Sequence, residues 1–137
     1  MPHDLERFVL EQDRDYAQVV DELRRGRKTS HWIWFIFPQL AGLGRSSMSQ
    51  RFAIASLDEA QAYLAHPVLG PRLRECARLV LAVQGRTADE IFGSLDAMKV
   101  RSSMTLFHRA APAEPEFRQV LDRYYGGVED EATVERL

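Results

Sequence analysis

Two four-residue segments of the chain share the sequence Arg-Ser-Ser-Met, at residues 45–48 and 101–104. A guanidinium fork beside two small hydroxyl groups suits the oxygens of a phosphate or carboxylate, because all three side chains donate hydrogen bonds. The first copy follows Gly42 and Gly44, where the backbone could approach a ligand closely. We therefore predict that an anionic ligand is bound by Arg45, Ser46, Ser47, Arg51, Arg101, Ser102 and Ser103.

The second copy lies on an expected helix that also carries Asp96 and Lys99, one of only two lysines beside sixteen arginines. Asp96, Lys99 and Ser103 fall between two apolar flanks of this helix, which predicts a buried position. Two interpretations stay open: Asp96 and Lys99 form a structural ion pair, or they line a polar cavity and carry protons for a bound substrate. The flanks are Leu95, Met98 and Leu106 on one side and Val100, Met104 and Phe107 on the other.

An apolar run rich in aromatic residues occupies positions 32–37. Such a run is typical of a protein core, but an edge of Trp32 or Trp34 could line a ligand cavity and stack on a planar ring. His31 joins this run to the basic residues before it. It could be a structural histidine or a proton carrier beside an anion.

These residues must be positioned by helices, because apolar residues recur every three or four positions along the chain. Ser56 with Glu59 and Thr87 with Glu90 have the spacing of capping boxes, which mark helix beginnings. Strand-like alternation is lacking, so we predict an all-α fold, a single compact domain of about six to seven helices. The expected helices cover residues 5–25 (with a possible break near residue 13), 57–65, 69–84, 88–92, 95–110 (capped by Ser94) and 117–125, with a short helix or extended segment at 32–37.

Composition agrees with a single domain over residues 1–137. The chain is 45% hydrophobic and 28% charged, with a formal net charge of −2, which excludes a disordered or collagen-like chain. The apolar run at 32–37 is far shorter than the roughly 20 residues that a membrane span needs. The first residues lack the basic and apolar regions of a secretion signal, so we expect a cytoplasmic protein that does not enter membranes.

Charge is unevenly distributed along the chain. Residues 24–57 contain no acidic side chain, whereas seven acidic residues follow from Glu114 onward. The basic segment could be neutralised within the fold, or it could form an anion site. An acidic protein partner, or the protein's own acidic C-terminal part, is the alternative occupant. Nucleic-acid binding is disfavoured by the acidic residues at both ends.

Metal and nucleophile chemistry receive little support. The four histidines are scattered and show no metal-ligand spacing, so we predict no metal site and no cofactor. Cys76, the only cysteine, lies in an apolar stripe where a thiol ionises poorly. No phosphate-binding loop of the Walker type is present.

Four segments carry a resemblance to a known bacterial family, the domain of unknown function 1810. They are residues 26–40, 42–48, 64–70 and 99–107, and the resemblance extends over nearly the whole chain. It implies a compact all-α fold and no established reaction.

A looser likeness links residues 96–107, with the following 115–117 and 120–121, to the C-terminal half of the NADAR family of N-glycosidases. That likeness implies a phosphorylated, ring-bearing substrate such as a nucleotide or ADP-ribose. Together with the arginine and serine segments, it leads to the prediction of a small-molecule binding protein, with hydrolysis of an N-glycosidic bond as its reaction if it is an enzyme. The alternative prediction is a non-catalytic protein-interaction domain that uses the basic segment.

Overall fold

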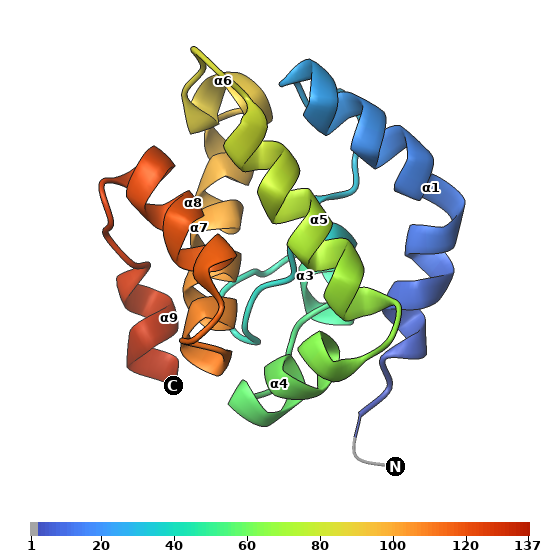
Figure 1. Ribbon diagram of the computed structural model, residues 1–137. Helices are drawn as coiled ribbons and strands as arrows, with labels where there is room; N and C mark the ends of the chain where they lie inside the picture. The colour runs from blue at the N-terminus through green and yellow to red at the C-terminus, as the bar shows by residue number, and fades with distance from the viewer. Residues whose placement is uncertain (1–2) are drawn as a thin grey trace.

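The backbone of residues 3–137, which the computed structural model describes, winds into helices joined by short loops (Figure 1). Within these residues the only β-type pairing is an isolated parallel bridge between Leu40 and Ile54. The predicted all-α fold is therefore confirmed. The helices are α1 (Glu6–Arg25), α2 (Ile33–Ile36), α3 (Ser47–Arg51), α4 (Leu57–Ala65), α5 (Leu69–Ala82), α6 (Ala88–Phe92), α7 (Ser94–Ala110), α8 (Pro115–Tyr125) and α9 (Glu131–Arg136).

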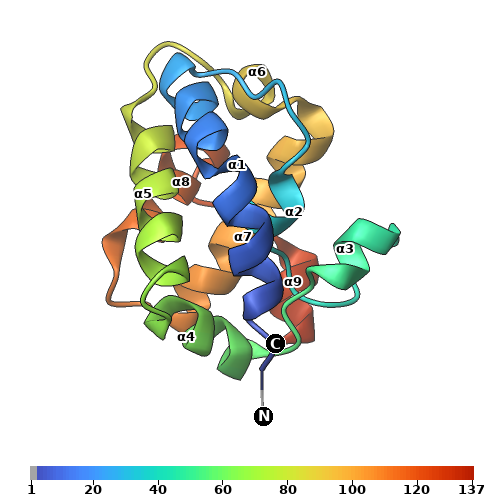
Figure 2. The ribbon, with the colours of Figure 1, turned by 90° about the vertical axis from the view of Figure 1, so that its right-hand side faces the viewer.

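Helix α7 is the central element, since it packs against α2, α4, α6, α8 and α9. Helix α5 crosses the front of the molecule and packs against α1, α4 and α8 (Figure 1). A quarter turn of the molecule shows α3 projecting from the body of the helices, away from α5 (Figure 2). The helices that surround α7 thus come from widely separated parts of the chain.

Helix α1 runs unbroken for 20 residues, so the break considered near residue 13 does not occur. It ends where the apolar period ends, at Gly26. That glycine has a φ of 72°, in the left-handed region that glycine enters at little cost. A Cβ at Gly26 would also lie 3.0 Å from a methyl carbon of Val83, so the next segment passes close to the end of α5.

Two of the three predicted capping residues, Ser56 and Thr87, cap helices; the third, Ser94, is instead the first residue of α7, whose N-cap is Gly93. Thr87 and Glu90 form the complete capping box at α6, each side chain bonding the backbone of the other. At α4, Ser56 accepts from Glu59 N as expected. The Glu59 carboxylate, however, accepts from Ala55 N at 2.7 Å, one residue earlier than in a standard box.

The short helices are the elements that periodicity described least well. The aromatic run contains the four-residue helix α2, one of the conformations considered for it. Helices α3 and α9 were not anticipated, because five or six residues span too little of the helix period to give a pattern. Their N-caps, Ser46 and Asp130, are recognisable in retrospect, since each accepts a bond from a backbone N–H three residues later.

Only one of the two apolar flanks predicted for α7 is buried along its whole length. Val100, Met104 and Phe107 are fully buried, as predicted. Leu95 and Met98 are exposed by 75% and 66%, so the other flank is buried only toward its C-terminal end. The first turns of α7 therefore carry two apolar side chains on the surface.

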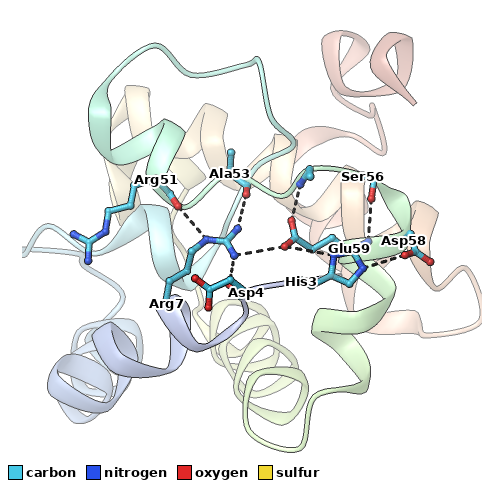
Figure 3. Close-up of polar contacts among 9 residues, drawn as sticks. His3, Asp4, Arg7, Arg51, Ala53, Ser56, Asp58 and Glu59 are labelled. Carbon is cyan, nitrogen blue, oxygen red and sulfur yellow. Dashed lines mark hydrogen bonds and ion pairs between the residues drawn. The ribbon is translucent and has the colours of Figure 1, made fainter. Parts of the chain in front are cut away.

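A polar cluster attaches the segment between α3 and α4 to the start of α1 (Figure 3). The guanidinium of Arg7 donates to Arg51 O at 3.0 Å and to Ala53 O at 2.7 Å, and it pairs with the buried Glu59 at 3.5 Å. Beside it, His3 bonds Asp58 at 3.0 Å. Because Ile54 also pairs with the loop after α2, this cluster fixes the position of that loop.

Among the residues that the structure describes, no helix is long and apolar enough to cross a membrane.

Candidate functional site

The two lysines of the chain meet at one carboxylate. Lys28 Nζ lies 2.7 Å from one oxygen of Asp96, and Lys99 Nζ lies 3.3 Å from the other. The Lys28 side chain is only 7% exposed, whereas that of Lys99 is 29% exposed. The ion pair between Asp96 and Lys99, one of the two interpretations considered from the sequence, is therefore present. With Lys28 added, the three groups carry a formal charge of +1.

Local structure explains how Lys28 arrives there. It follows the left-handed turn at Gly26, and its backbone N–H donates to Ile91 O at 2.7 Å, which holds this segment against α6. Asp96 lies in the first turn of α7, where the helix dipole favours a negative charge. The cluster thus joins the segment after α1 to the beginning of α7.

Each lysine also lies over a tryptophan. Lys28 Nζ is 5.2 Å from the ring centroid of Trp32, and Lys99 Nζ is 5.5 Å from that of Trp34, both within the range of cation–π attraction. Trp32 is 1% exposed, so it offers no face to a ligand. Trp34 is half-buried. Its indole nitrogen is buried without a partner among residues 3–137, so the part of Trp34 that reaches the surface is the apolar ring.

Sequence reasoning missed the residue that holds Trp32 in the core. Glu22 occupies a buried position of α1 and accepts bonds from Thr29 N, Ser30 N, Ser30 Oγ and Trp32 Nε1 at 2.6 to 3.1 Å. Burial alone would raise the pKa of Glu22, but the bonds from Ser30, Thr29 and Trp32 outweigh it and lower the pKa to about 2. The available signal was a charged residue three positions after the apolar Val19, on the core side of the helix.

A groove of about 300 Å³ opens beside Lys99. Its walls come from the loop between α2 and α3, from the first turns of α7, and from the beginning of α9. This volume is at the lower end of the range for small-molecule sites. The lining residues are Gln39, Leu43, Gly44, Leu95, Met98, Lys99, Ser102, Asp130 and Ala132.

The two serines of the second Arg-Ser-Ser-Met segment have different surroundings. Ser102 lines the groove, and its hydroxyl donates to Met98 O at 3.2 Å. Ser103 is 0% exposed, and its Oγ has no hydrogen-bond partner within residues 3–137. Of this pair, the structure brings only Ser102 to the groove.

Arg101 anchors the chain next to the groove and does not line it. Its guanidinium donates to Val128 O at 2.9 Å and to Glu129 O at 3.1 Å. Arg109 adds a two-bond pair to Glu129, at 2.8 and 2.7 Å. These contacts hold the segment that leads into α9, and that segment supplies Asp130 and Ala132 to the groove.

The residues of the first Arg-Ser-Ser-Met segment do not line the groove. Arg45, Ser46 and Ser47 are exposed, and Ser46 caps α3 by accepting from Ser49 N at 3.1 Å. Arg45 directly follows the lining residue Gly44. Arg51 points elsewhere, pairing with Glu11 of α1 at 3.4 Å.

His31 is exposed and lines a neighbouring hollow of about 350 Å³ at the start of α7. The hollow shares Leu95 with the groove, and Asp96 also lines it. His31 and Lys99 therefore line two separate hollows that share Leu95.

The structure also bears on a metal site and on a reactive cysteine. Among residues 3–137, no group of three or more His, Cys, Asp or Glu side chains could hold a metal ion. Cys76 is buried, and burial raises the pKa of its thiol to about 12. At that pKa the thiol is un-ionised near neutral pH, as the apolar stripe predicted.

The basic segment is partly neutralised inside the fold. Arg25 pairs with Asp21 at 3.1 Å, while Lys28 and Arg51 pair with carboxylates of α7 and α1. These partners lie outside the acidic C-terminal part of the chain.

Comparison with known proteins extends these observations to relatives. A family model described as "Protein of unknown function (DUF1810)" matches residues 2–137. The crystal structure of the conserved hypothetical protein Rv1873 from Mycobacterium tuberculosis is similar, with a TM-score of 0.98 and 57% sequence identity over 100% of this chain and 98% of that chain. No curated protein matches. The chain therefore belongs to the DUF1810 family, as its sequence motifs predicted.

Proposed function

We propose that the groove beside Lys99 binds a small anionic molecule that carries a planar ring. The observation that supports this most directly is the position of the Lys99 ammonium group, which lines the groove while Asp96 and the Trp34 ring hold it from the protein side. An ammonium group has three N–H donors, and the bond to Asp96 uses one of them. The others are available to a phosphate or carboxylate.

Charge and shape both favour such a ligand. Lys28, Asp96 and Lys99 together carry +1, so the cluster attracts an anion even though Asp96 is negative. Leu43 and Met98 give the groove apolar walls, which suit the faces of a flat ring. Arg45, which is exposed and follows the lining residue Gly44 in the chain, adds a further positive charge to this loop.

The ligand class that we favour is a phosphorylated nucleotide or a molecule like ADP-ribose. We assign Asp96 to positioning Lys99, because each of its carboxylate oxygens already faces an ammonium group. Hydrolysis of an N-glycosidic bond stays a prediction. Detection of the free base, released from a nucleotide incubated with the protein, would establish this activity.

The experiment is a ligand titration followed by thermal unfolding. Adenosine monophosphate, ADP-ribose and inorganic phosphate are added up to millimolar concentration to the native chain and to Lys99→Met. A ligand at a hundredfold excess over its Kd stabilises the native state by about 2.7 kcal/mol, which a shift in Tm reports. We expect stabilisation by at least one nucleotide and a loss of affinity of tenfold or more in Lys99→Met.

Arg14→Met is the control, since it removes a single positive charge from a side chain that is 74% exposed on α1. It should leave the affinity within twofold. The proposal fails if none of the three ligands raises Tm, or if Lys99→Met binds as tightly as the native chain.

A further inference from the structure

Asp130 is a groove residue that the anion hypothesis does not account for. It caps α9, and one of its carboxylate oxygens, Oδ2, accepts both from Thr133 N at 3.0 Å and from Thr133 Oγ1 at 2.6 Å. Its own backbone N–H donates to Thr105 Oγ1 at 2.9 Å. Hydrogen bonds therefore hold both the backbone and the carboxylate of Asp130. The second oxygen, Oδ1, is the part of this half-buried side chain that remains for a partner in the groove.

A fixed carboxylate in a site for anions has a cost unless the ligand brings a hydrogen-bond donor to it. Lys99 is the only cation lining the groove among the described residues, so an anion that also approaches Asp130 meets both charges. A ligand with its anionic group at one end and an N–H donor at the other satisfies both. A ligand without the donor leaves a carboxylate desolvated and repelled.

Other lining groups agree with a ligand that has polar edges. The backbone carbonyl of Gln39 is occupied by Ile54 N at 2.9 Å, so the group of Gln39 that can serve a ligand is its side-chain amide, which both donates and accepts. The Ser102 hydroxyl donates to Met98 O and therefore offers its lone pairs to a donor. Two of the polar groups that line the groove, the Asp130 carboxylate and the Ser102 hydroxyl, can thus accept hydrogen bonds from a ligand.

We infer that Asp130 determines specificity in the groove, selecting anionic ligands whose ring carries an N–H donor, such as amino-substituted or lactam heterocycles of nucleotides. Lys99 holds the anionic group, and Asp130 Oδ1 accepts from the ring. This inference rests on the proposed function, because it concerns the same groove.

The test compares ligands that differ only at the ring. Adenosine monophosphate has an amino group and inosine monophosphate has a lactam N–H, whereas purine riboside monophosphate has the same ring system, sugar and phosphate without any ring N–H donor. Calorimetric titration of the native chain should show the first two binding at least tenfold more tightly than the third, since an unmatched buried acceptor is penalised.

Asp130→Asn gives the sharper result. Asparagine is as good an N-cap as aspartate, and its oxygen must face Thr133 to keep that cap, so its NH₂ group faces the groove. A donor then stands where an acceptor stood. We expect the ring preference to vanish or reverse, with the unsubstituted purine riboside monophosphate gaining affinity and the other two losing it.

Glu131→Gln is the matched control, because it removes the same charge from the adjacent exposed residue. It should preserve the preference of the native chain, and the Tm of each variant reports whether α9 remains folded.

The outcomes separate the two proposals. If no ligand binds, the proposed function fails and this inference fails with it. If all three monophosphates bind the native chain equally, or if Asp130→Asn keeps the native preference, the role of Asp130 is refuted while binding at Lys99 stands.

Discussion

Lys28 and Lys99 approach opposite oxygens of the same carboxylate, that of Asp96, at 2.7 and 3.3 Å, although 71 positions of the chain separate them. One of the two side chains is nearly enclosed and the other reaches the groove. This asymmetry divides the cluster into a structural part and a part that is available to a ligand. It also means that the two lysines can be distinguished by substitution.

We expect Lys28→Met to lower the free energy of unfolding by roughly 2–3 kcal/mol, because it removes one partner of a largely buried ion pair. Asp96 keeps Lys99, so the loss is smaller than for a fully orphaned charge. Lys99→Met should cost about 1 kcal/mol or less, as expected for a more exposed pair. Urea denaturation measures both values. A Lys28→Met variant as stable as Lys99→Met would contradict this division.

Stability should fall in acid through Glu22. Its pKa in the folded protein is lowered to about 2 from an ordinary value of 4.5, so the folded state binds protons less readily than the unfolded chain. The resulting stabilisation is fully present above pH 4.5 and is lost as the pH falls toward 2. Urea denaturation between pH 2 and pH 6 measures this slope.

Glu22→Gln should abolish that part of the slope and cost roughly 2–4 kcal/mol at neutral pH, because the amide would place a donor against the backbone and indole donors. Asp21→Asn, on the same helix but exposed, is the control and should keep the slope. Unchanged acid sensitivity in Glu22→Gln would show that other carboxylates cause it.

Arg101→Met should loosen the C-terminal segment without unfolding the protein. The substitution removes the donors to Val128 O and Glu129 O, while the contacts of Arg109 and Thr105 remain. We expect amide hydrogen exchange in residues 128–136 to accelerate on the order of tenfold, since local opening of a peripheral segment becomes easier. Arg118→Met, which removes an exposed pair within α8, should leave this exchange unchanged. Equal protection in both variants would count against the anchoring role.

Gly44→Ala should displace the loop that forms one wall of the groove. A Cβ at Gly44 would lie 2.4 Å from the Cβ of Ser49, a distance that forces one of the two segments to move. We expect a loss of about 1–3 kcal/mol, typical of overpacking. Ser49→Gly should relieve the clash, so the double variant should be more stable than the sum of the two single effects by at least about 0.5 kcal/mol. Thermal unfolding of the four chains gives the coupling, and additive effects would exclude this contact.

Most of the helices could be predicted from the sequence because their causes are local. The period of apolar residues, the capping residues Ser56 and Thr87, and the stop at Gly26 all act within a few turns of the backbone, and α1, α4 and α6 follow them closely. The motifs of the DUF1810 family likewise lie in the linear sequence. Helices α3 and α9 were missed because five or six residues are too few to show the helix period; α3 rests on its Ser46 cap and α9 on its Asp130 cap and its packing against α7.

The composition of the groove depended on the tertiary structure. Identical Arg-Ser-Ser-Met segments have different roles, since the first forms an exposed loop and cap, while the second contributes Ser102 to the groove and Arg101 to the anchor of α9. Trp32 and Trp34 likewise separate, the first held in the core by Glu22.

Sequence by itself determined the longer helices, the capped helix α6 and the side chains that are available for chemistry, because these follow from residue type and local spacing. Only the packing of α7 against α2, α6 and α9 decided that Lys99 faces a groove, that Lys28 joins it at Asp96, and that Asp130 stands in the same groove. These contacts join residues up to about a hundred positions apart, and no local pattern specifies which distant surfaces will pack together.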